Sequence, residues 1–399
     1  MNAERYSVCT MLDTKSNSIR SQRALIPTMQ LLSPAKSPRS RSLTRKPVVL
    51  PLYHGLSSEE KARMSLASAF SENSQFHSRY AIHNIVGFGS NGVVLAAQDL
   101  SKPEFKAVAI KVIYKPHSGN LNQVSGEVQA LKAFADVAST SSILQYVDDW
   151  QDANHFYLVT ELFGSDWMSY AAVGERPKDT QFRPIIVNGR SFQVHSGSSD
   201  LWAWSYVHRL HLFKTEGHTL LAFQPIQSII KQAAVALSVI HSRSFYHGDV
   251  KIENIIIQAA TDTGDAVSDN SASIRLADFG HSKYIYHGIK SYGTKAVSPP
   301  ELLHDAPFNR KELDGRSADV YALGMCLYTL LNKDCRLPTG TQSLGYFELL
   351  AQSNGYFPFE GIPDLCEDGW NLLHGMCRID PAQRMGMAQV LAHPWLSAA

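Results

Sequence analysis

Two short segments constrain this chain more than any other feature. Residues 247–254 read His-Gly-Asp-Val-Lys-Ile-Glu-Asn, and residues 278–280 read Asp-Phe-Gly. Transfer of a phosphoryl group from a magnesium-bound nucleotide needs one carboxylate to orient the attacking hydroxyl and a cation to neutralise the transferred charge. It also needs a second carboxylate and an amide as metal ligands. The two segments supply this set, namely Asp249, Lys251, Asn254 and Asp278.

A glycine-rich segment lies upstream of these residues. Gly87, Gly89 and Gly92 follow the apolar run 80–86, and a second strand-like run, 93–97, comes directly after them. Glycines let backbone amides approach phosphate oxygens closely, and this pattern alone fits a dinucleotide-binding fold equally well. That fold requires a helix after the glycines, so the second strand argues against it.

Lys111 ends an alternating run, 108–111, that predicts a half-buried strand. Sixteen residues later, Glu127 lies on the apolar face of a predicted helix around residues 124–135. An acid on such a face is costly to bury unless it is paired, and Lys111 is the available cation. The alternatives are a solvated lysine at a sheet edge and a carboxylate at the rim of the helix face.

Further segments appear in a fixed order along the chain. They are 156–164, Gly293-Thr294, 298–301, 319–324, a D-P-x-x-R stretch that ends at Arg384, and 391–395. With the segments above, they resemble the eukaryotic protein kinases of the serine/threonine type, over residues 78–398. The ending 391–395 is similar to that of calmodulin-dependent-type kinases.

The resemblance implies a two-lobed α+β protein kinase fold. Its N-lobe, 78–161, would be a small antiparallel sheet with one key helix, and its C-lobe, 164–398, would be mainly helical. ATP and Mg²⁺ would bind between the lobes. An ion pair between Glu301 and Arg384 is also expected.

The resemblance further implies a role for each site residue. Asp249, Lys251, Lys111 and Glu127 would be catalytic, and Asn254 and Asp278 would bind the metal. The residues expected to contact the nucleotide are Val86, Gly87, Gly89, Gly92, Val94, Ala109, Lys111, Thr160, Glu161, Phe163, Asp166 and Ile256.

The chain departs from the family pattern at several positions. Gly248 replaces the arginine that in many kinases pairs with a phosphorylated activation loop, so activity without loop phosphorylation is expected. Four other departures look like variations in packing: Ile252, Val297, Pro299 and Tyr321. One alternative is a kinase-fold scaffold that acts by binding partners. A second is a small-molecule kinase, against which the segment around Thr294 and Glu301 argues.

Residues 1–75 are expected to form a disordered basic tail that contains serine and proline. Between Met1 and Pro47, nine Lys and Arg residues stand against Glu4 and Asp13, and such a composition buries too little apolar area to fold. The alternatives are a plain linker, a tail phosphorylated by regulatory kinases, and a mitochondrial transit peptide, which the two acids disfavour.

The whole composition limits location and partners. The net charge of +1 gives no sign of nucleic-acid binding, and five cysteines without paired spacing predict an intracellular protein, cytoplasmic or nuclear. No apolar run is long enough to span a membrane. By the kinase resemblance, Glu253 and Asp166 would lie where family members place acids that meet basic residues, so protein substrates with arginine upstream of the acceptor serine or threonine are expected.

An insertion covers about residues 170–222. Trp202, Trp204 and Tyr206 alternate at period two, which predicts a strand or hairpin packed on the lobe. Local packing, partner docking and a zinc site at His208, His211 and His218 are the three interpretations.

Overall fold

The computed structural model describes most of the chain after the tail. The described ranges are 53–102, 106–116, 124–138, 141–164, 185–187, 189–192, 200–205, 223–258, 272–302, 313–332, 359, 362 and 365–397. All of them belong to one compact unit, Val49–Ala399. The predictions for residues 1–52, for Asp166 and for His208, His211 and His218 lie outside these ranges.

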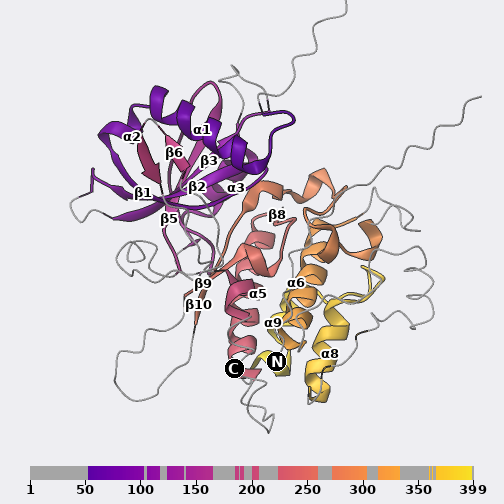
Figure 1. Ribbon diagram of the computed structural model, residues 1–399. Coiled ribbons are helices and arrows are strands. Elements are labelled where there is room, and N and C mark those ends of the chain that lie inside the picture. Colours follow the sequence, from indigo (N-terminus) through magenta and orange to yellow (C-terminus); the bar gives the residue numbers. More distant parts are fainter. Residues whose placement is uncertain are drawn as a thin grey trace, which may run out of the picture. The chain divides into compact units, whose positions relative to one another are not determined.

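The first part of this unit is a five-stranded antiparallel sheet (Figure 1). Its strands, in spatial order, are β1 (Tyr80–Phe88), β2 (Gly92–Asp99), β3 (Ala107–Tyr114), β5 (His155–Glu161) and β4 (Tyr146–Gln151). The helix α3 (Gly126–Phe134) lies between β3 and β4 in sequence. The expected antiparallel sheet with one key helix is therefore confirmed.

The second part is mainly helical, as predicted. Its helices are α5 (Gln224–Ser242), α6 (Gly315–Leu331), α8 (Glu367–Met376), α9 (Met387–Leu391) and α10 (Pro394–Ser397). Two short antiparallel ribbons join β9 (Ile255–Gln258) to β10 (Ser273–Leu276) and β8 (Phe245–Tyr246) to β11 (Lys283–Tyr284). Almost every residue of α6 is buried, so it is the central helix of this lobe. None of the described helices has the length and apolar character needed to span a membrane.

Each part has its own hydrophobic core. Leu95, Ile110 and Val159 are among the buried side chains of the sheet core. The larger core is built on α5 and α6 and also includes Leu131 and Phe134 of α3. Helix α3 therefore packs against the helical lobe although it belongs to the N-lobe by sequence, and this placement brings Glu127 close to both lobes.

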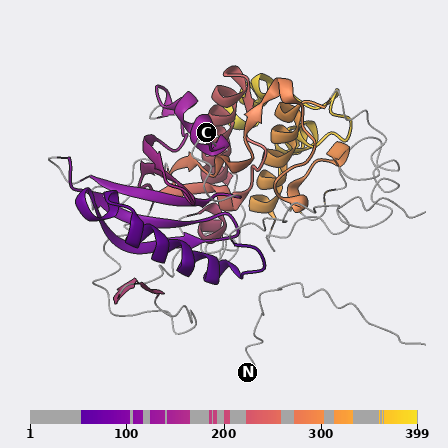
Figure 2. The ribbon, with the colours of Figure 1, turned by 90° about the horizontal axis from the view of Figure 1, so that it is seen from above.

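The expected disorder of residues 1–75 is wrong for their last part. The helix α1 (Ser58–Glu72) begins with a capping box, in which Ser57 and Glu60 exchange hydrogen bonds between side chain and backbone. Its side chains Ala62 and Leu66 are fully buried in the sheet core, and Figure 2 shows this indigo helix running along the sheet. The short helix α2 (Gln75–Ser78) follows. Small and apolar residues on one face of α1 thus bury enough apolar area to hold the helix on the sheet. The average composition of residues 1–75 did not indicate this face.

The insertion packs in part against this added helix. The hairpin of β6 (Ile185–Val187) and β7 (Arg190–Phe192) is antiparallel, and the Phe192 ring stacks on Phe70 with centroids 5.0 Å apart. The predicted strand around Trp202 and Trp204 is wrong, because residues 201–205 are helical. Leu201 and Ser205 are the buried residues of this turn, and Trp202 lies exposed.

Candidate active site

The glycine-rich turn joins β1 to β2 directly. The amide of Gly89 donates to the carbonyl of Gly92 at 2.9 Å, which closes the turn. A Cβ on Gly92 would lie 2.6 Å from the carbonyl oxygen of Val112 on β3, so this position has no room for a side chain. Two strands flank the glycines, and the dinucleotide-fold alternative, which needs a helix there, is excluded.

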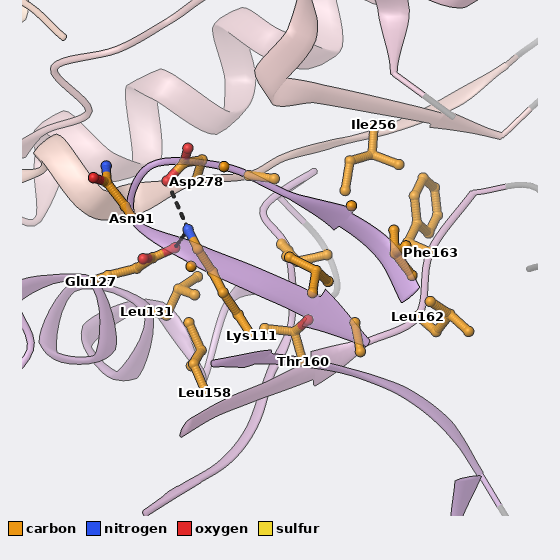
Figure 3. A pocket seen from close by; sticks show the side chains of 18 of the residues that line it. Asn91, Lys111, Glu127, Leu131, Leu158, Thr160, Leu162, Phe163, Ile256 and Asp278 are labelled. Atoms are coloured by element: carbon orange, nitrogen blue, oxygen red, sulfur yellow. Dashed lines mark hydrogen bonds and ion pairs between the residues drawn. The ribbon is translucent and has the colours of Figure 1, made fainter. Parts of the chain in front are cut away.

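Lys111 forms ion pairs with two acids from different elements (Figure 3). Its Nζ lies 2.7 Å from Oε1 of Glu127 on α3 and 2.9 Å from Oδ1 of Asp278. The side chain of Glu127 is buried, whereas that of Asp278 is 43% exposed. The ion pair predicted between residues 111 and 127 is therefore present, and the edge-lysine and rim-carboxylate alternatives are wrong.

The three groups shift one another's pKa values. Burial opposes the charge of Lys111, but Glu127 and Asp278 outweigh it and raise the pKa of this lysine. The charge of Lys111 lowers the pKa of Asp278 to about 2, against the effect of burial. Burial raises the pKa of Glu127, and Lys111 only partly opposes this shift. Asp278 thus remains a carboxylate at any physiological pH, as a metal ligand must.

The loop that carries Asp249 is bound through its backbone to the carboxylate of Asp319 on α6. The amides of His247 and Gly248 donate to the two oxygens of this carboxylate at 2.7 and 2.9 Å. Burial lowers the pKa of His247, so its ring is neutral. The ring lies 3.0 Å from the carbonyl of Ala277, which accepts from its Nε2–H, and thereby links this loop to the segment that carries Asp278.

Asp249 lies at the centre of a small polar cluster. Its Oδ2 is 3.2 Å from Nζ of Lys251 and accepts from the side-chain Nδ2 of Asn254 at 3.2 Å. Lys251 also donates to the hydroxyl of Thr294 at 2.9 Å. The other oxygen of Asp249, Oδ1, is buried and has no hydrogen-bond partner among the described residues. An unpaired buried acceptor is costly, so this oxygen is the acceptor of the cluster that still lacks a donor.

A cavity of about 340 Å³ lies between the sheet and the helical lobe. Ile256 of β9 lies on the opposite side of the cavity from Lys111 and Thr160 (Figure 3). Every described residue that the sequence analysis assigned to nucleotide contact lines it, namely Val86, Gly87, Gly89, Gly92, Val94, Ala109, Lys111, Thr160, Glu161, Phe163 and Ile256. Its size and largely apolar walls suit a small ligand with a flat ring.

Several wall residues were not predicted. The apolar ones are Phe88, Leu131, Leu144, Leu158, Leu162 and Ala277, and the polar ones are Ser90 and Asn91. The apolar residues carry no signal that distinguishes them from ordinary core residues. Leu131 follows Glu127 by one helical turn, so the helical spacing could have placed it there.

The segment after β5 is held by a residue that the sequence analysis also missed. Arg275 of β10 donates to the carboxylate of Glu161 at 2.8 Å, and its guanidinium lies 4.4 Å from the centre of the Phe163 ring. The same carboxylate accepts from the amide of Gln145 at 3.0 Å. These contacts fix the backbone of residues 161–163 along the cavity wall.

A second predicted ion pair lies deep in the helical lobe. The guanidinium of Arg384 donates to both oxygens of Glu301 at 2.7 and 2.9 Å, and both side chains are almost completely buried. This bidentate pair holds the segment that follows Thr294 onto the lobe.

Asn254 and Asp278 fit a magnesium site. The amide of Ala277 donates to the carbonyl of Asn254 at 2.9 Å, so the two candidate ligands are carried by adjoining segments. The side-chain nitrogen of Asn254 is taken up by Asp249, which leaves the amide oxygen for a metal. Two oxygen ligands from protein, completed by phosphates and water, are typical of Mg²⁺. The described residues contain no cluster of three or more His, Cys, Asp or Glu side chains that suits a metal.

Comparisons with known proteins agree with this geometry. Residues 193–396, more than half of the chain, match the family model for the protein kinase domain. The chain therefore belongs to the protein kinase family. The predicted kinase fold and the resemblance of the sequence to protein kinases are confirmed.

Three curated relatives of this chain are named serine/threonine-protein kinases. The chain is 29% identical over 182 residues to serine/threonine-protein kinase cds1 of Schizosaccharomyces pombe, across 43% of this chain and 36% of that protein. It is 26% identical to the SIK3 homolog of Danio rerio, across 79% of this chain and 21% of that protein. It is 22% identical to calcium/calmodulin-dependent serine/threonine-protein kinase 1 of Oryza sativa subsp. japonica, across 91% of this chain and 52% of that protein. The chain thus spans from about a fifth to about half of these relatives.

The Lys111 ion pairs predict a pH-dependent loss of stability when the lysine is removed. Lys111→Met leaves Glu127 buried without its cation, which should lower the free energy of unfolding by about 2 kcal/mol at pH 8. The group that titrates is Glu127, whose pKa is raised in the folded state by burial. Such a group contributes stability below its unfolded pKa, and this contribution is lost as the pH rises. The deficit should therefore be smaller at pH 5 than at pH 8, as measured by urea unfolding of the nucleotide-free protein.

The double variant Lys111→Met/Glu127→Gln is the matched control. It removes the unpaired charge, so it should be more stable than the single variant at pH 8 and should show little of the pH dependence. Equal stability of Lys111→Met and wild type at both pH values would contradict the assigned pairing.

Proposed function

We propose that this protein is an active serine/threonine protein kinase that transfers the γ-phosphoryl group of ATP to protein hydroxyls. The observation that carries the proposal is the Asp249 cluster. One oxygen of this buried carboxylate has no hydrogen-bond partner among the described residues, while its other oxygen is held by Lys251 and Asn254. The cluster lies beside a cavity whose lining includes Lys111 and Asp278. The names of the relatives support the serine/threonine class.

The chemistry follows from these positions. Oδ1 of Asp249 would accept the hydrogen bond of the acceptor hydroxyl and take its proton as the new bond to phosphorus forms. The bond from the γ-phosphorus to its bridging oxygen breaks, and ADP leaves. Lys251 would neutralise charge on the transferred group, and Lys111 would hold the α- and β-phosphates. Mg²⁺, held by Asn254 and Asp278, would supply charge neutralisation and orientation of the phosphates.

We further propose that activity does not require phosphorylation of the activation segment. Gly248 offers no cation to a loop phosphate, yet the activation segment, residues 281–297, already contacts the catalytic loop, residues 247–254. Thr294 accepts from Lys251, and the amide of Gly293 donates to the carbonyl of Gly248 at 2.9 Å. Phosphatase treatment should leave the activity of the purified protein unchanged, and loss of activity with recovery on rephosphorylation of residues 281–297 would contradict this proposal.

Asp249→Asn tests the proposed mechanism. The variant keeps the shape but cannot take the proton, so phosphate transfer from ATP to a generic basic protein should fall by at least about 100-fold. ATP affinity should be unchanged, because Asp249 is not among the residues that line the nucleotide cavity.

Asp368→Asn, at an exposed position in the first turn of α8, is the matched control and should keep full activity. Near-wild-type transfer by Asp249→Asn would overturn the mechanism. Failure of the wild type to transfer phosphate, with ATP still bound, would favour the alternative of a kinase-fold scaffold.

We also propose a preference for substrates with arginine upstream of the acceptor. Glu253 is exposed in the loop that carries Asp249, with no hydrogen bond or ion pair to another described residue. An exposed ion pair contributes up to about 1 kcal/mol, which corresponds to about fivefold in catalytic efficiency. A peptide with arginine three residues before the serine should exceed its alanine version by about this factor.

Glu253→Gln should remove that difference, whereas Glu367→Gln, at an exposed position of α8, should keep it. Equal efficiency of wild type on both peptides would exclude the preference and leave the kinase assignment intact.

A further inference from the structure

Tyr292 joins the activation segment to the catalytic loop. It lies between the short helical turns Ile285–His287 and Lys295–Val297, and its side chain is buried. Its hydroxyl accepts from the amide of Val250 at 2.9 Å and donates to Oδ1 of Asp319 at 3.0 Å. One phenol group thus connects its own segment to two others, through partners that lie 42 and 27 residues away in sequence.

Asp319 is the point where these connections meet. Its carboxylate accepts from the amides of His247 and Gly248, and its Oδ2 lies 3.0 Å from Nε2 of His241 on α5. Tyr292 is therefore bound to the same group that sets the backbone of the catalytic loop. A shift of the tyrosine would displace the backbone of Val250, which is next to Asp249.

Three consecutive residues of the segment each contact this loop. Tyr292 contacts Val250, the amide of Gly293 donates to Gly248, and Thr294 accepts from Lys251. A Cβ on Gly293 would lie 2.5 Å from Cγ of Asp249, so the backbone here lies directly against the carboxylate. Residues 292–294 therefore form a zipper along residues 248–251, and this zipper fixes the position of Asp249.

The zipper does not depend on a phosphate. Its members are backbone amides and carbonyls, two hydroxyls, one lysine and one buried carboxylate. Burial, together with the nearby Asp319, raises the pKa of Tyr292 well above its usual range, so the hydroxyl keeps its proton. Gly248 has no side chain that could receive a phosphate, and it contributes its backbone to the zipper.

We propose that Tyr292 is a positioning residue that holds residues 292–294 against the catalytic loop and so substitutes for an activating phosphate. The proposal rests on the proposed kinase function and explains how the segment stays docked in that function. The tyrosine does not touch substrate. It acts through Val250 and Asp319 on the orientation of Asp249, and through Thr294 on Lys251.

Tyr292→Phe removes only the hydroxyl and leaves the amide of Val250 and one oxygen of Asp319 without this partner. We expect kcat for peptide phosphorylation, per folded molecule, to fall about 10-fold or more. KM for ATP should stay within twofold, because Tyr292 is not among the residues that line the nucleotide cavity. A purely structural role would instead reduce the folded fraction and leave kcat per folded molecule unchanged.

Tyr286→Phe is the matched control. Tyr286 belongs to the same segment, its side chain is 71% exposed and it stacks on Tyr284, so its loss should leave kcat unchanged. Both variants are assayed after phosphatase treatment, which removes any phosphate that would mask the effect.

Amide hydrogen exchange separates this proposal from the proposed function. In Tyr292→Phe, exchange at the amides of Val250 and Gly293 should accelerate about 10-fold or more, while exchange in α5 should not change. This readout needs no catalysis, so it stands even if the wild type transfers no phosphate. Unchanged exchange at both amides, or a kcat within twofold of wild type, would overturn the role of Tyr292.

Discussion

The pairing of Lys111 with Glu127 and Asp278 is the interaction on which the site depends. It joins a strand of the sheet, a helix that packs into the other core, and the loop that would bind the metal. Burying the charges of Lys111 and Glu127 is costly, and the cost is offset because both acids lie within 3 Å of the ammonium group. The position of α3 is therefore tied to the ionisation of the site. An N-lobe that lost this helix would lose the lysine geometry with it.

Asp319 has the corresponding role in the helical lobe. It is a completely buried carboxylate that is satisfied by two loop amides, a tyrosine hydroxyl and a histidine ring. Such a fully satisfied network is rigid, because any displaced donor would leave a buried group unpaired. The backbone of the catalytic loop is thus positioned by a carboxylate of the buried core. The activation segment then extends the same network by one residue, Tyr292.

How much could be predicted from sequence varies with the range of the interaction. The pairing of Lys111 with Glu127 was predictable, because helical spacing placed an acid on an apolar face and one strand lysine was available. The roles assigned to Asp249 and Asp278 required the motif and its order in the chain. Glu301 and Arg384 could be paired in the same way, from the resemblance of their segments.

Contacts without a periodic or motif signal were missed. Arg275 pairs with Glu161, which lies 114 residues earlier in the sequence. Tyr292 donates to Asp319 because the activation segment folds against α6. The helix α1 was missed for a different reason. Its capping signal, Ser57 followed by Glu60, was present, but the serine-rich composition before it favoured disorder. The turn at 201–205 shows that alternating aromatics do not specify a strand when an apolar side chain such as Leu201 can be buried by a helix.

We propose that Lys111, Asn254 and Asp278 bind magnesium and a nucleotide, and equilibrium binding tests this proposal most directly. The affinity of the purified chain for a non-hydrolysable ATP analogue should be measured with Mg²⁺ and with a chelator, in wild type and in Asp278→Asn. We expect Mg²⁺ to strengthen binding by about 10-fold or more in wild type, because Asp278 holds its charge at neutral pH. In Asp278→Asn the gain should nearly disappear. An equal gain in both proteins, or no binding by wild type, would contradict the account.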